Sequence, residues 1–96
     1  MTDYQLNVLE EIRNDCDVCM NALTVLMPKA GNAMTRGKIY QCIYRTCEEM
    51  KRKLYDWVED DNDDEQVRVR YETLRLINNV MKVAVALVEF EDRKAL

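Results

Sequence analysis

The sequence predicts an all-α protein, an antiparallel three-helix bundle in which a long α-hairpin packs against a third, broad-faced helix. The chain has only two glycines and one proline, too few for the frequent turns of a sheet protein. Its apolar residues recur at steps of three and four, the spacing of one helical face. Its 96 residues suit one domain. We therefore expect a single domain over 1–96, with helices at about 3–27, 34–59 and 64–93.

The first helix has a start signal, a face and a stop signal. Thr2 followed by Gln5 predicts a capping box, in which side chains bond the free backbone N–H groups of the first turn. Pro28 and Gly31 then end the helix and form the first turn. The predicted core face is a row at heptad positions a and d: Leu9, Ile12, Cys16, Cys19, Leu23 and Leu26.

The second helix repeats this pattern. Asn32 and Thr35 are both plausible N-caps, and Gly37 weakens the first turn. Two regular rows of equal length joined by a short turn are typical of an α-hairpin. The second row consists of Tyr40, Ile43, Cys47, Met50, Leu54 and Trp57.

The third helix follows an acidic, solvated turn at 59–65, where Asp63 and Gln66 predict another capping box. Two apolar rows share this helix and together make a broad face. Either the face lies in the groove of the hairpin, or part of it stays open for a partner or a second copy. The rows are Leu74, Ile77, Met81, Ala84 and Val88, and Leu76, Val80, Val83, Leu87 and Phe90.

Composition narrows the function. The chain has no histidine, and so lacks the commonest general base and metal ligand. A net charge of −4 disfavours nucleic acid and anionic membranes as partners. The longest apolar run, Val80–Phe90, is too short to span a bilayer, and no signal peptide is evident. We expect a cytoplasmic, non-enzymatic protein without cofactors, whose cysteines are reduced.

The four cysteines allow three interpretations. Cys16 and Cys19 form a C-x-x-C, and folding the hairpin brings Cys42 level with Cys19 and Cys47 level with Cys16. They are small core residues, a zinc site, or disulfides between two helices. Zinc needs four converging thiolates, but Cys42 and Cys47 point about 140° apart around their helix. Core packing is therefore favoured.

The acidic turn resembles the start of a calcium loop only in part. With Asp61 at position one, Asp63 and Glu65 fall at three and five, and Glu72 falls at twelve. Gln66 replaces the required glycine, and the residues after it favour helix. A solvated turn, or a contact with a basic partner, is the better prediction.

By elimination, the sequence predicts a protein–protein interaction module that acts as an adaptor, inhibitor or regulatory subunit. The alternatives are a hairpin organised by zinc or disulfides at its cysteines, and a structural homodimer through the third helix. The predicted apolar contacts are Leu76, Val80, Val83, Leu87 and Phe90, and the predicted steering charges are Asp60, Asp61, Asp63 and Asp64.

Overall fold

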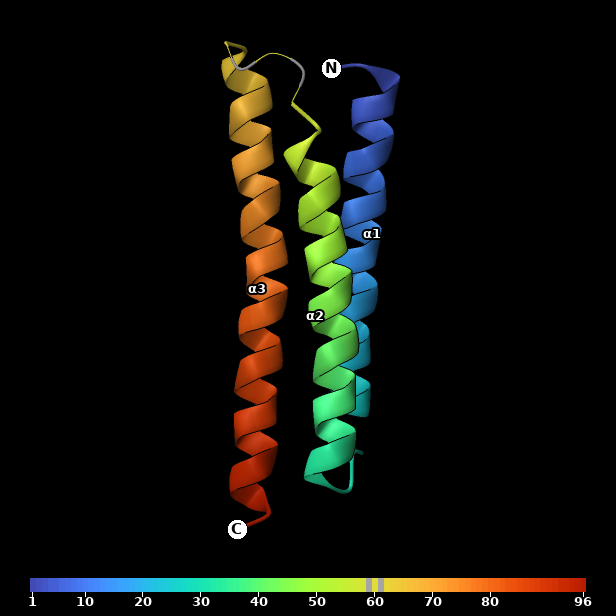
Figure 1. Ribbon diagram of the computed structural model, residues 1–96, viewed down its shortest axis with the longest axis vertical. Helices are drawn as coiled ribbons and strands as arrows, with labels where there is room; N and C mark the ends of the chain where they lie inside the picture. Colours follow the sequence, from blue (N-terminus) through green and yellow to red (C-terminus); the bar gives the residue numbers. More distant parts are fainter. Residues whose placement is uncertain (59, 61) are drawn as a thin grey trace.

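The computed structural model describes residues 1–58, 60 and 62–96. It contains α1 (Asp3–Leu26), α2 (Ala33–Tyr55) and α3 (Asp64–Lys94), which run alternately down, up and down (Figure 1). Every pair of helices is in contact, and the whole measures 52 × 18 × 16 Å. The prediction of an all-α, antiparallel three-helix bundle is confirmed.

Each helix begins at a polar cap. The Thr2–Gln5 box is complete: the Gln5 amide donates to Thr2 Oγ1 (3.1 Å), and the Thr2 amide donates to Gln5 Oε1 (3.0 Å). Asn32 caps α2 by accepting from the Thr35 amide at 2.8 Å. Asp63 caps α3 through the Gln66 amide (3.3 Å), but the Gln66 side chain reaches the Asp63 carboxylate (3.2 Å) and not its backbone N–H.

The second helix ends at Tyr55, so the expected helical structure from Asp56 to Val58 is wrong. Trp57 explains the early end. Its ring is 1% exposed, and its Nε1 donates to the Gln5 carbonyl at 2.8 Å. By leaving the helix here, the chain buries this ring with its N–H satisfied. The expected final residue, Glu59, lies outside the described residues.

The apolar core runs the length of the rod and is built by all three helices. Ile77, Val80 and Ala84 of α3 are buried in it, so most of the broad face of α3 lies in the groove of the hairpin. Leu26 departs from the expected pattern, because Met27 is fully buried there and Leu26 is exposed.

At both ends of the rod, buried polar side chains form hydrogen bonds that connect different segments of the chain. At one end the Gln5 side chain is fully buried, and its Nε2 donates to the Trp57 carbonyl (3.0 Å) and to Gln66 Oε1 (3.1 Å). At the other end the buried Arg36 donates to Asp92 (2.8 Å) and to the Ala30 carbonyl (3.2 Å). Across the part of the chain that is described, no buried side-chain nitrogen or oxygen lacks a partner.

Candidate functional site

The predicted apolar contacts on α3 do not form one exposed face. Val80 is 2% exposed and belongs to the core. Val83 and Leu87 are half-buried against it. Leu76 and Phe90 are exposed, and the Lys94 ammonium lies 5.2 Å from the centre of the Phe90 ring. Val80 is buried because it lies beside Ile77 and Ala84, on the strip of α3 that packs against the hairpin.

The predicted steering charges lie at one end of the rod. Asp60 and Asp64 are exposed, and Asp63 is half-buried as the cap of α3. Asp61 lies outside the described residues. Glu65 and Glu72 are both within α3, so the segment is no open calcium loop. Within residues 1–58, 60 and 62–96, no group of three acidic, cysteine or histidine side chains could hold a metal ion.

Three thiols share the core, and the fourth does not join them. Cys16, Cys19 and Cys47 are buried, whereas Cys42 is exposed, and all four are free. The Cys16 thiol donates to the Met50 sulfur at 3.7 Å. Burial, with neighbouring Cys and acidic residues, raises the pKa of Cys16 and of Cys47 from 9.0 to about 11. Such thiols stay protonated at neutral pH and are poor nucleophiles and poor metal ligands.

Two depressions lie along the outer seam between α2 and α3, and we call them together the α2–α3 groove. The first has a volume of about 380 Å³ and the second about 490 Å³. Lys51 lines both. The first part is lined by Lys51, Leu54, Tyr55, Val67, Arg70, Tyr71 and Leu74. The second is lined by Tyr40, Tyr44, Glu48, Lys51, Met81, Lys82, Val85, Ala86 and Glu89.

The α3 side of the groove is a third apolar row on that helix, which sequence reasoning missed. It steps by four and three residues, as a coiled-coil seam does. Leu74 and Met81 of this row also pack against the core, but Tyr71 is 62% exposed and Val85 is 41% exposed. The heptad spacing was visible in the sequence, but the row shares Leu74 and Met81 with a core row and has an asparagine at its centre. The row is Val67, Tyr71, Leu74, Asn78, Met81 and Val85.

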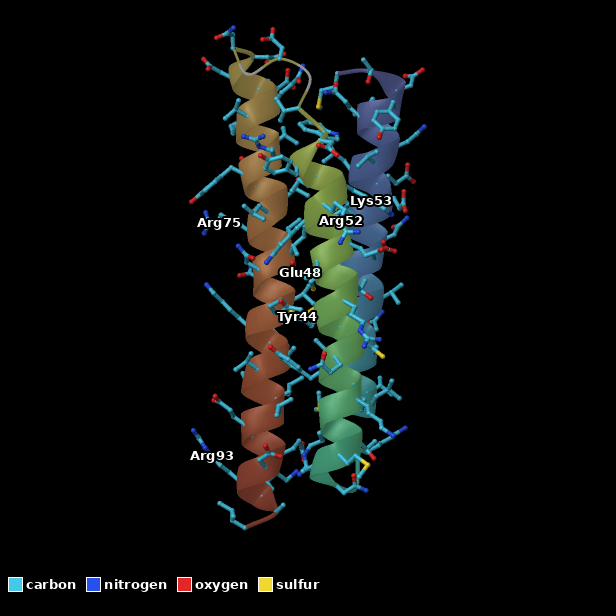
Figure 2. All side chains as sticks on the ribbon, in the orientation of Figure 1. Tyr44, Glu48, Arg52, Lys53, Arg75 and Arg93 are labelled. Carbon is cyan, nitrogen blue, oxygen red and sulfur yellow. The ribbon has the colours of Figure 1, made fainter. Side chains whose placement is uncertain are left out.

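The α2 side of the groove is aromatic. Tyr40 and Tyr44 stack with ring centres 6.4 Å apart, and Tyr55 is 79% exposed at the other end. Figure 2 shows Tyr44 and Glu48 on the side of α2 that faces α3, whereas Arg75 projects from the far edge of α3. Tyrosine suits such a place because one end of the ring is apolar and the other is polar.

Charge is distributed unevenly along the groove. Of the described residues that line its first part, the charged ones are Lys51 and Arg70, both cationic. The second part carries the carboxylates of Glu48 and Glu89, together with Lys82. Lys51 sits where the two parts meet, 3.6 Å from the Glu48 carboxylate. The groove thus has a cationic end and an end that holds its acidic groups.

Comparison with known protein families, with curated proteins and with solved structures gives no match for this chain. Among the residues that the structure describes, no helix is long and apolar enough to cross a membrane. The geometry of the α2–α3 groove therefore carries the functional argument. An apolar trough between two helices, with tyrosines along its rim, offers contact area and hydrogen-bonding groups to another helix.

Proposed function

We propose that this protein is a non-enzymatic interaction module, acting as an adaptor, inhibitor or regulatory subunit, and that a helix docks in its α2–α3 groove. One observation carries the proposal: Val67, Tyr71 and Val85 are exposed along one edge of α3, in a heptad row with Leu74 and Met81, which line the groove. A seam of this spacing is stabilised when a neighbouring helix covers it. Here the neighbour is missing from the single chain.

The dimensions of the groove support a helical occupant. The row from Val67 to Val85 covers about 27 Å, or roughly five helical turns. A fourth helix lying over it would complete a four-helix arrangement, with axes about 8–10 Å apart. Tyr55 and Tyr71 would then supply the buried aromatic contacts on which interface energy usually depends.

The exposed carboxylates at one end of the rod would guide the partner toward the groove. Asp60 and Asp64 are exposed beyond the cationic end of the groove, and they would speed the approach of a partner with a basic surface. The thiols give less support to a rival function, because Cys42 is exposed while the other three thiols are buried in the core.

Site-specific photo-crosslinking tests the proposal in cells that produce the protein. A photoreactive phenylalanine analogue at Tyr71 should give one dominant crosslinked product, because that ring lies in the docked interface. The same analogue at Glu72, an exposed position about 100° further around α3, is the matched control and should give little product. Equal crosslinking at both positions, or none at Tyr71, would show that the groove is not the docking surface.

A further inference from the structure

We infer that the α2–α3 groove is covered by the same groove of a second copy, with α3 lying against α3 and α2 against α2, so that the two chains are related by a two-fold axis at Asn78. This inference rests on the proposed function of the groove and names its occupant. The four helices that meet are α2 and α3 of each copy. In this pairing each of the four runs antiparallel to both of its neighbours, as in an up-and-down four-helix bundle.

The residues along the groove are arranged symmetrically about Asn78. Val67 and Glu89 are the outermost α3 residues of the groove, and each lies eleven residues from Asn78. Tyr71 and Val85 each lie seven residues from it. A two-fold axis at Asn78 therefore places the large ring of Tyr71 over the smaller Val85 of the second copy. Large-against-small contacts of this kind let two surfaces interdigitate.

Charge selects the direction of this axis. Two copies could face each other about an axis along the rod, but their cationic ends, each carrying Arg70, would then lie at the same end of the pair. An axis across the rod instead places Arg70 near Glu89 of the second copy. The uneven charge of the groove is thus complementary to itself when one copy is reversed.

Asn78 explains the register. It is an exposed polar residue at the centre of an otherwise apolar row. On the axis, its amide meets the same amide of the second copy, and each can donate to and accept from the other. A single asparagine in an apolar seam fixes alignment and oligomeric state, because any shifted register would bury it without a partner.

The available area suits a stable pair. The groove follows α3 for about 33 Å between Val67 and Glu89 and is two helices wide, roughly 20 Å. Each copy would thus cover about 660 Å², or about 1,300 Å² in total. Specific protein interfaces bury about 1,200–2,000 Å², so the pair falls at the lower end of the stable range.

Oligomeric state is the first test. Light scattering coupled to size-exclusion chromatography should give twice the 11.4 kDa chain mass at micromolar concentration. Tyr71→Glu should give a monomer with unchanged helical circular dichroism, because the ring is outside the core of the single chain. A wild-type chain that stays monomeric up to about 100 µM would overturn the inference.

Crosslinking tests the position of the axis. Asn78→Cys in a Cys42→Ser background should form a disulfide-linked dimer with oxidised glutathione, because the two new thiols meet across the axis. Asn79→Cys is the matched control: it is also exposed but lies about 100° further around α3. Equal dimer yields from the two variants would show random collision and not the proposed pairing.

A charge exchange tests the direction of pairing. Arg70→Glu and Glu89→Arg should each raise the dissociation constant of the dimer about tenfold or more, and the double variant should return it to within about threefold of the wild type. Additive losses in the double variant would overturn the antiparallel arrangement.

The photo-crosslinked product at Tyr71 separates the two claims. A product of two copies of the chain supports both the groove and its occupant. A product with a different protein, together with a monomeric wild type, retains the groove as a docking surface and overturns the second copy. No product at Tyr71 overturns both.

Discussion

At the scale of single residues, one buried amide joins three segments of the chain. The Gln5 side chain contacts the start of α1, the Trp57 carbonyl and the Gln66 side chain at the start of α3. Both of its polar atoms are used, since Oε1 accepts and Nε2 donates. A shorter or apolar side chain would leave the buried Trp57 carbonyl without the donor that Gln5 provides.

We therefore expect Gln5→Ala to lower the free energy of unfolding by about 2–4 kcal/mol. The variant loses the capping box, worth about 1 kcal/mol, and leaves the Trp57 carbonyl and the Gln66 amide oxygen without the Gln5 donor. Urea unfolding followed by circular dichroism measures the loss. Gln41→Ala, at an exposed position of α2, should change stability by less than about 0.5 kcal/mol. Equal effects of the two variants would contradict a special role for Gln5.

The buried thiols predict a loss of stability at high pH. The pKa of Cys16 and of Cys47 is raised from 9.0 to about 11, so both stay protonated in the folded state while the unfolded chain ionises. Their contribution is complete below pH 9 and is lost as the pH rises to about 11. Each unit of pKa difference is worth about 1.4 kcal/mol, which implies a loss on the order of 2 kcal/mol per thiol.

Urea unfolding at several pH values between about 8 and 11 measures this slope. The double variant Cys16→Ala, Cys47→Ala serves as the control, because it lacks these two thiols and keeps every other ionisable group. It should be less stable at neutral pH, because cavities remain, but its stability should fall less steeply above pH 9. The same slope in both proteins would show that the thiols are not the cause.

At the scale of the helix, α2 contains a glycine that its position does not require. Gly37 lies in the first turns of α2, and a Cβ atom added there would meet no atom within 4 Å. Its backbone does not use the left-handed conformation that favours glycine. The residue therefore contributes only flexibility to the unfolded chain.

We expect Gly37→Ala to stabilise the protein by about 0.5–1 kcal/mol, because alanine loses less backbone entropy in a helix. A rise in the midpoint of thermal unfolding measures the gain. Gly31→Ala, in the turn outside the helices, has equal free space and should gain less, since it lacks the helix-propensity term. A larger gain at Gly31 would contradict this account.

An ion pair also connects the hairpin to α3. Arg36 is buried near the start of α2, and its guanidinium lies 2.8 Å from the Asp92 carboxylate, which is half-exposed. Asp92→Asn should lower the free energy of unfolding by about 1–2 kcal/mol, because a nearly buried cation loses its counter-charge. Glu10→Gln, at an exposed site of α1, should have an effect near zero. The difference is measured by urea unfolding at low salt, and similar losses would exclude the role assigned to Asp92.

The helices were predictable because their core rows are regular and their caps are local. Thr2 and Asn32 contact residues only three positions away, so the sequence alone contains both partners. The end of α2 was not predictable, because it depends on the bond from Trp57 to Gln5, 52 residues away. The groove was missed for a related reason. Leu74 and Met81 belong to the core and also line the groove, so which neighbouring row faces outward depends on how α3 is rotated against the hairpin.

At the scale of the whole molecule, pairing of two copies couples stability to concentration. If the dimer is the stable form, mass action raises the midpoint temperature of unfolding as protein concentration increases. Scanning calorimetry between about 5 and 500 µM should show a rise of several degrees for the wild type. Tyr71→Glu should show no dependence. A wild-type midpoint that is constant across this range would argue against a dimer as the folded unit.

The odd number of helices has a further consequence. Met1 and Leu96 lie at opposite ends of the rod (Figure 1), whose length is 52 Å. Any two bodies attached to these positions would be held far apart by a stiff spacer. In the antiparallel pair, each tip would present one amino terminus beside one carboxyl terminus. A donor and an acceptor fluorophore joined to the two termini would then transfer energy weakly within one chain and strongly between the two chains of a pair. Energy transfer would therefore report dimer formation.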